Sequence, residues 1–198
     1  MREIVFATNN KNKIREMKQK LGQYGIEVLS QEEAGININV EETGETFKDN
    51  AFLKAQAVYD ILKKPVIADD SGLCIDALNG APGVHSHRFA GENATDLDRN
   101  NYVLAQLKDV PYSERTAVFK CCVCFIDEND EPHFFEGSAE GIIGTDSHGT
   151  NGFGFDPIFH YEGGGRSFAD YTPEEKNAVS HRGKAVSQFI DYIISHNE

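Results

Sequence analysis

Helix and strand signals alternate along residues 47–72, which read FKDNAFLKAQAVYDILKKPVIADDSG. The first part predicts a helix with Thr46 as N-cap and Pro65 after its end, because apolar residues recur on one helical face. These apolar residues are Phe47, Ala51, Ala55, Val58 and Leu62. The run 66–68 then predicts a short buried strand that ends at a polar turn, 69–72. Because ligands bind beyond strand ends in open α/β sheets, we expect a site at this turn.

The N-terminal segment has the same organisation. Residues 3–7 are a short β-rich run that stops at the polar turn 8–10. Ile14, Met17 and Leu21 then recur at the spacing of an amphipathic helix. The segment therefore predicts a strand, a polar turn and a helix.

The second half of the chain has longer strand signals. Residues 116–126 and 133–143 flank the polar turn 127–131, which predicts a hairpin. Residues 145–156 form a glycine-rich loop. Further helix starts are expected at Thr95 with Asp98, at the capping box from Thr172 to Glu175, and at Ser180. Strand-helix-strand units combined with a hairpin favour the α/β class with a mixed sheet.

Composition restricts the classes of function. The 198 residues carry a net charge of −13, from 32 acidic and 19 basic side chains, which repels duplex nucleic acid and anionic membranes. A polyanionic substrate would therefore need local lysines and a metal ion. The apolar runs fall short of the roughly 20 residues that cross a bilayer, and the N-terminus does not resemble a signal peptide. We expect one cytoplasmic domain, with its four cysteines acting as small buried hydrophobes.

The first candidate site is the strand-to-helix turn near the N-terminus. Backbone N–H groups at a helix start attract anions, and a lysine there adds a full positive charge. The residues concerned are Thr8, Asn9, Asn10, Lys11, Asn12 and Lys13. Without glycines this is no Walker A loop, and a capped helix start with no ligand explains the same residues.

The second candidate is a set of carboxylates. Glu41 and Glu42 precede the helix that starts near residue 47, and Asp69 and Asp70 follow the strand at 66–68. Together they offer the oxygen-rich surroundings that Mg²⁺ prefers. A solvated acidic surface is the alternative for the glutamates. The adjacent aspartates repel each other unless a cation relieves them, which favours a functional role.

The third candidate lies near the C-terminus. Phe153, Gly154, Phe155 and Asp156 combine aromatic faces with a carboxylate, which suits the stacking of a base and hydrogen bonds to its edge. Two phenylalanines in the core are the alternative. Lys176, His181 and Arg182 offer donors to a carbonyl-bearing ring or a phosphate, although an exposed helix start would also explain them.

These signals occur together in a pattern that resembles a known family, the inosine/xanthosine triphosphate pyrophosphatases, also called the Ham1 or non-canonical purine nucleoside triphosphatase family. The resemblance covers nearly the whole chain and rests on seven motifs in order. They are Phe6–Lys13, Glu41–Gly44, Phe47–Ala55, Ala68–Gly72, Gly80–Gly83, Gly152–Pro157 and Glu175–Arg182. Asn9 departs from the pattern, which usually has glycine at that position.

The resemblance implies Mg²⁺-dependent hydrolysis of ITP, dITP or XTP to the monophosphate and pyrophosphate. It implies an elongated mixed sheet flanked by helices, within one bilobed domain over residues 1–198 and with a nucleotide cleft between the lobes. It also implies a homodimer. By motif, Asp70 positions or deprotonates the water, and Glu41 and Glu42 join it as metal ligands.

The resemblance also assigns the substrate contacts. Phosphate contacts fall on the turn at 8–13, with Thr8, Asn10 and Lys13 foremost, and on Lys54; Ser71 lies beside the base. Phe153 stacks on the purine within the segment 153–156. The residues expected to read the base are Asp156, Lys176, His181 and Arg182.

Two other functions stay open at this stage. A related-fold pyrophosphatase for pyrimidine or other modified nucleotides would share Lys13 and Asp70, but would lack the Ser-His-Arg element at 180–182. A non-catalytic module that binds nucleotides or divalent ions would explain the acidic surface without turnover. Incubation with ITP and Mg²⁺, followed by a pyrophosphate assay, separates the module from the enzyme.

Overall fold

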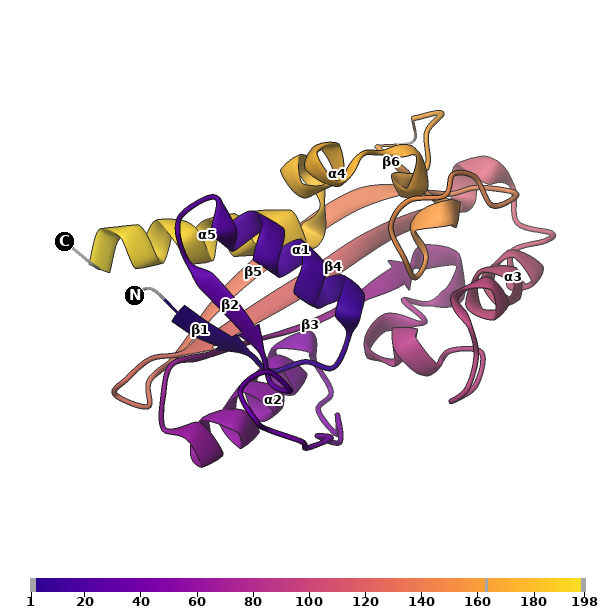
Figure 1. Ribbon diagram of the computed structural model, residues 1–198. Helices are drawn as coiled ribbons and strands as arrows, with labels where there is room; N and C mark the ends of the chain where they lie inside the picture. Colours follow the sequence, from indigo (N-terminus) through magenta and orange to yellow (C-terminus); the bar gives the residue numbers. More distant parts are fainter. Residues whose placement is uncertain (1–2, 163, 197–198) are drawn as a thin grey trace. The chain divides into compact units, whose positions relative to one another are not determined.

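A computed structural model describes residues 3–162 and 164–196 of the chain (Figure 1). These residues form a sheet with strand order β2-β1-β3-β4-β5-β6. The strands are β1 (Glu3–Phe6), β2 (Glu27–Ser30), β3 (Val66–Ile75), β4 (Thr116–Ile126), β5 (Pro132–Ile143) and β6 (Phe159–Tyr161). β1 pairs in parallel with β2 and β3, whereas β5 and β6 are antiparallel. The predicted α/β fold with a mixed sheet is confirmed.

Among the described residues, helices lie in every connection between consecutive strands except that from β4 to β5, and three more follow β6. The α-helices are α1 (Lys11–Gly22), α2 (Phe47–Leu62), α3 (Asp96–Gln106), α4 (Pro173–Val179) and α5 (His181–His196). Short 3₁₀ helices are η1 (Asp76–Leu78), η2 (Gly83–Arg88), η3 (Tyr112–Glu114), η4 (Asp156–Ile158) and η5 (Phe168–Asp170). No helix within the described ranges is long and apolar enough to span a membrane.

The chain divides into two compact units. Within the described residues, the first unit comprises 3–70, 121–137 and 182–196, and the second comprises 71–120, 138–162 and 164–181. The boundaries cut β3, β4 and β5, so each of these strands contributes residues to both units.

The core of the first unit lies on both faces of its strands. Figure 1 shows α1 and α5 on one face and α2 on the other. Phe6 belongs to the cluster that α1 and α5 cover, and its neighbour Val5 to the cluster that α2 covers. Successive side chains of a strand point to opposite faces, so a strand between two helical layers is mostly apolar on both faces. The surroundings of a polar side chain in β3 therefore depend on the face to which it points.

A separate hydrophobic cluster forms the core of the second unit. Val103 and Leu107, at the end of α3, pack in it with strand and 3₁₀ residues. Phe119, Phe159 and Phe168 form its aromatic centre, with ring centroids 4.6 to 6.1 Å apart. This cluster supports the loop that precedes η4, since Phe155 is one of its members.

Capping groups begin the helices where the sequence predicts. The Thr46 hydroxyl accepts the Asp49 N–H at 3.1 Å, and reciprocal capping boxes join Thr95 to Asp98 and Thr172 to Glu175. Such side chains satisfy backbone N–H groups that have no partner inside the helix. The starts of α2, α3 and α4 are therefore determined locally.

The strand predicted at 66–68 differs from the one observed. β3 continues to Ile75, so Asp69 and Asp70 lie within a strand and not in a turn. Both are buried and both have cationic and hydrogen-bonding partners, which makes continuation of the strand compatible with their charge. Because they are adjacent in a strand, the two carboxylates point to opposite faces.

Candidate active site

The turn between β1 and α1 has the structure of a capped helix start. The Asn10 carboxamide oxygen accepts the N–H groups of Asn12 at 3.0 Å and Lys13 at 3.2 Å. Thr8 stabilises the turn through its hydroxyl, which accepts the Asn10 N–H at 3.2 Å. Asn9 accepts a hydrogen bond from Gln31 at 2.9 Å. Phosphate binding by Thr8–Lys13 stays a prediction, because several groups of the turn already have internal partners.

Asp69 is the counter-ion of two cations in the first unit. Its carboxylate lies 3.0 Å from Lys13 Nζ and 3.0 Å from Arg182 Nε, and its side chain has no solvent exposure. Burial alone would raise the pKa of Asp69, but the charges of Lys13, Arg182 and Lys54 hold it well below its usual range. Arg182 is also buried, and its Nη1 pairs with Glu16 at 2.7 Å. Asp69 therefore fixes Lys13 and Arg182.

Asp70 has different surroundings, on the α2 side of β3. Lys54 Nζ lies 3.5 Å from its Oδ1 and also pairs with Glu42. Burial raises the pKa of Asp70, and the negative charges of Glu42 and Asp69 add to the rise, whereas Lys54 and Lys13 oppose it. A buried carboxylate with a raised pKa is suited to accept a proton.

Asn50 is a site residue that the sequence analysis missed. This residue of α2 is 1% exposed; its Nδ2 donates to Asp70 Oδ2 at 3.2 Å, and its Oδ1 accepts the Gly44 N–H at 2.8 Å. A Cβ at Gly44 would lie 2.6 Å from the Cβ of Asp49, so only glycine fits. A polar residue three positions after Phe47, on the apolar face of a predicted helix, was the available signal.

The glutamates expected to bind metal precede α2. Glu42 is half-buried through its pair with Lys54, and Glu41 is exposed. Asn50 ties the end of this segment, at Gly44, to Asp70. The structure therefore brings Glu42 near Asp70, while a metal contact by Glu41 stays a prediction.

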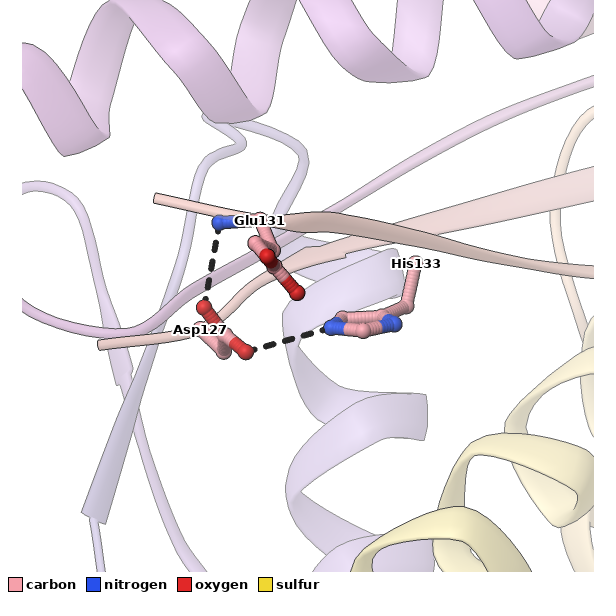
Figure 2. Close-up of side chains that lie close together, drawn as sticks. All are labelled: Asp127, Glu131 and His133. Atoms are coloured by element: carbon pink, nitrogen blue, oxygen red, sulfur yellow. Dashed lines mark hydrogen bonds and ion pairs between the residues drawn. The ribbon is translucent and has the colours of Figure 1, made fainter. Parts of the chain in front are cut away.

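A different group has its ligand atoms within 4.8 Å of one another: Asp127, Glu131 and His133 (Figure 2). It spans the turn between β4 and β5 and the start of β5; in the turn, Asp127 accepts the N–H groups of Asn129 at 2.8 Å and Glu131 at 3.0 Å. His133 Nε2 lies 3.2 Å from Asp127 and 3.2 Å from the Tyr192 hydroxyl. These contacts explain the group as a stabilised hairpin turn, and it is not the predicted metal site.

In the second unit, the loop before η4 is organised around Asp156. Its buried Oδ2 accepts the Phe153 N–H at 2.9 Å and a hydrogen bond from Lys176 Nζ at 2.6 Å. Lys176 Nζ also lies 4.8 Å from the centroid of the Phe153 ring, a cation–π arrangement. Three of the predicted base-binding residues are thus neighbours within this unit.

The residues predicted to lie near the base differ in their burial. Phe155 is buried in the core of the second unit, while Phe153 is half-buried outside the core clusters. His181 is buried and stacks on Phe119 with ring centroids 4.6 Å apart. Ser71 is half-buried at the start of the second unit. Contact of these residues with a nucleotide stays a prediction.

The cysteines are thiols outside any disulfide, as expected. Cys121, Cys122 and Cys124 are buried in β4, and Cys74 is partly buried. Burial raises the pKa of all four thiols, to about 12 for Cys122 and Cys124. They remain protonated near neutral pH, which favours a packing role over nucleophilic chemistry.

Comparisons with known proteins extend over nearly the whole chain. The dITP/XTP pyrophosphatase of Photorhabdus laumondii is 45% identical over 195 residues, 98% of each chain. That of Halalkalibacterium halodurans is 44% identical over 193 residues, 98% of this chain and all of its own. The structure of a HAM1 protein from Coxiella burnetii has a TM-score of 0.88 at 43% identity, with 98% and 100% of the two chains covered. The model of the Ham1 family matches residues 4–192, and the chain belongs to that family.

Proposed function

We propose that this protein hydrolyses non-canonical purine nucleoside triphosphates, such as dITP, ITP and XTP, to the monophosphate and pyrophosphate. The observation that carries the proposal is Asp70, a buried carboxylate that lies 3.5 Å from Lys54 Nζ and accepts a hydrogen bond from Asn50 at 3.2 Å. It occurs in a chain that is 45% identical to a dITP/XTP pyrophosphatase. Neither of the alternatives, a pyrophosphatase for other modified nucleotides or a non-catalytic binding module, is favoured by these relatives.

The proposed reaction is the attack of water on the α-phosphorus. The water oxygen forms a bond to phosphorus, the bond from phosphorus to the α–β bridging oxygen breaks, and pyrophosphate leaves with that oxygen. Asp70 accepts the proton that the water loses. Lys13 and Lys54 supply positive charge for the phosphates, since such transfers depend mainly on alignment and charge neutralisation.

The carboxylates of the first unit fit a bound Mg²⁺. Asp70 and Glu42 share Lys54 as a partner, and Glu42 contributes to the raised pKa of Asp70, so a further cation would relieve their repulsion. Oxygen ligands are those that Mg²⁺ prefers, and we propose Glu41, Glu42 and Asp70 as the set that holds it. When bound, the ion would neutralise negative charge on the phosphates.

For the base, we propose stacking on Phe153 and hydrogen bonds from its neighbours. Phe153 is half-buried, with Lys176 Nζ near its ring and Asp156 holding its backbone. His181 and Arg182 complete the proposed set, with Ser71 beside the base. A buried donor that faces a 6-amino group in place of a 6-oxo group would lose its partner, at a cost of about 1–3 kcal/mol.

One experiment tests the proposed reaction. The wild-type protein is incubated with ITP and Mg²⁺, and pyrophosphate and orthophosphate are measured separately, beside an Asp70→Asn variant. We expect IMP and pyrophosphate from the wild type, and a kcat at least about 100-fold lower in the variant, because Asn cannot accept the proton. Thermal unfolding of Asp70→Asn should match the wild type.

The possible outcomes separate the alternatives. Orthophosphate without pyrophosphate would reject the proposed bond cleavage, and near-wild-type turnover by Asp70→Asn would reject the role of Asp70. Turnover of modified pyrimidine triphosphates in preference to ITP would favour the related-fold pyrophosphatase. Binding of ITP without turnover would indicate a binding module.

We also propose a homodimer in the cytoplasm. The dimer follows from the family resemblance, and light scattering of the purified protein tests it. The cytoplasm is where a nucleotide pool is found, and four thiols outside any disulfide are compatible with its reducing conditions.

A further inference from the structure

Helix α3 holds the loop that carries Phe153. Both backbone polar groups of Gly154 are bonded to side chains of this helix: the N–H donates to Asp96 Oδ2 at 2.7 Å, and the carbonyl oxygen accepts from Asn100 Nδ2 at 3.0 Å. Residues four apart in a helix lie on the same face, one turn from each other. Two side chains on one face of α3 therefore bind both backbone polar groups of Gly154.

The helix side of this contact is itself fixed. Arg99 is buried, and its Nη1 donates to the carbonyl oxygens of His87 at 2.8 Å and Ala94 at 2.6 Å. Its Nη2 pairs with the other carboxylate oxygen of Asp96. Asp96 is thus held in orientation by a residue that is anchored to the backbone outside the loop.

The loop side is equally constrained. Gly154 has a φ of 63°, and Gly152 a φ of 72° with no room for a side chain, since a Cβ there would lie 2.1 Å from Asp156 Oδ2. Asp156 accepts the Phe153 N–H. Phe153 is therefore held at its own N–H by Asp156 and, through the next residue Gly154, by α3.

Only one half of the buried Asn100 amide has a hydrogen-bond partner among the described residues. The residue is 2% exposed, and its Oδ1 has no hydrogen-bond partner among the described residues. The donor half of the amide faces the Gly154 carbonyl, which leaves the acceptor half without a donor. Buried polar atoms without partners are rare and unfavourable, so an amide at this position calls for a compensating role, and its bond to Gly154 supplies one.

We propose that Asp96 and Asn100 are positioning residues for the base: they fix Gly154 and so place the Phe153 ring before a nucleotide arrives. The inference rests on the proposed function, in which Phe153 stacks on the purine. A loop that is already ordered loses less conformational freedom on binding, so the contact strengthens substrate binding and leaves the chemical step unchanged. Removal of the contact should therefore raise the KM and leave the kcat unchanged.

The test compares three variants of α3. Asp96→Ala and Asn100→Leu each remove one bond to Gly154. Asp98→Ala is the matched control, because Asp98 is a carboxylate of the same helical turn that caps α3 through Thr95. For each protein we would measure hydrogen exchange of residues 152–156 without nucleotide, thermal unfolding, and the kcat and KM for ITP.

The two loop variants should show faster exchange at 152–156 and a KM for ITP raised about tenfold, the effect of losing one hydrogen bond of this kind, at a kcat close to that of the wild type. Asp98→Ala should lower the melting temperature while exchange at 152–156 and KM stay at wild-type values. Wild-type exchange and KM in Asp96→Ala and Asn100→Leu would overturn the inference, as would equal effects in Asp98→Ala. If the wild type releases no pyrophosphate from ITP, the proposed function fails, and the exchange measurements alone decide whether α3 holds the loop.

Discussion

Asp69 and Asp70 are adjacent in the sequence and yet have opposite electrostatic surroundings. Asp69 faces the cations Lys13 and Arg182, and its pKa is lowered in spite of burial; the pKa of Asp70 is raised by burial. Strand geometry is the reason, because neighbouring side chains of β3 point to opposite faces. One carboxylate therefore stabilises the site, and the other remains suited to chemistry.

Asp69→Asn should destabilise the protein by about 3–5 kcal/mol, since it leaves the buried charges of Lys13 and Arg182 without their partner. Denaturant unfolding of the variant and the wild type near neutral pH measures the difference. Asp60→Asn serves as the control, because Asp60 forms an exposed ion pair with Lys63 and should matter little.

The difference in stability between the wild type and Asp69→Asn should also depend on pH. The pKa of Asp69 is lower in the folded state than in the unfolded one, so its stabilising effect is complete above the unfolded pKa of about 3.9 and is lost as the pH falls below it. The stability gap between wild type and Asp69→Asn should be constant near neutral pH and shrink in acid. A gap that widens in acid would contradict the assignment.

Lys13 and Arg182 share Asp69 but should differ in their effect on substrates. Lys13→Ala should raise the KM for ITP and ATP alike, because a phosphate contact does not depend on the base. Arg182→Ala should impair the hydrolysis of ITP more than that of ATP if Arg182 donates a hydrogen bond to the 6-oxo group. Since Arg182 also pairs with Asp69 and Glu16, the melting temperature of the Arg182→Ala variant must be measured beside its kinetics. Equal losses for every nucleotide in both variants would refute this division of roles.

At the scale of elements, the loop at 152–156 joins a core residue to a proposed substrate contact. Phe155 is buried in the core of the second unit, whereas Phe153 is half-buried beside Lys176. Glycines at 152 and 154, both with positive φ, allow the chain to turn so that the two rings have different surroundings. The loop therefore presents one aromatic ring and anchors the other.

These two phenylalanines make a matched pair. Phe153→Ala should weaken ITP binding by about 1–3 kcal/mol, the usual loss of a base-stacking ring, with little change in thermal stability. Phe155→Ala should instead cost about 3–5 kcal/mol of stability, as for a truncated core ring. Thermal unfolding without nucleotide and the KM for ITP measure both. A large fall in melting temperature with an unchanged KM for Phe153→Ala would place Phe153 in a structural role.

Helix α2 contributes both to the core of the first unit and to the contacts of Asp70. Its apolar residues Ala51, Ala55 and Val58 pack on the strands of the first unit, as their spacing predicts. Its polar residues Asn50 and Lys54 both contact Asp70. The helix thus places these polar groups at Asp70 through the same packing that forms the core.

At the scale of the whole molecule, predictions from the sequence were best where structure is local. The capped starts of α2, α3 and α4 and the strand β4 at 116–126 lie where expected, because caps and periodicity act over a few residues. The strand at 66–68 was predicted too short, since two carboxylates suggest a turn unless their distant partners are known. The family resemblance was likewise available from the motifs, and the family match confirms it.

The sequence by itself determined the class of fold, the positions of most helices and strands, and membership of the Ham1 family. Only the tertiary structure decided which groups meet: Arg182 with Asp69, 113 residues away, Asn50 with Gly44 and Asp70, and α3 with Gly154. The physical reason is that caps and hydrophobic periodicity are satisfied within a few residues. Contacts between distant residues instead depend on strand order, register and the face to which each side chain points, which no short stretch of sequence contains.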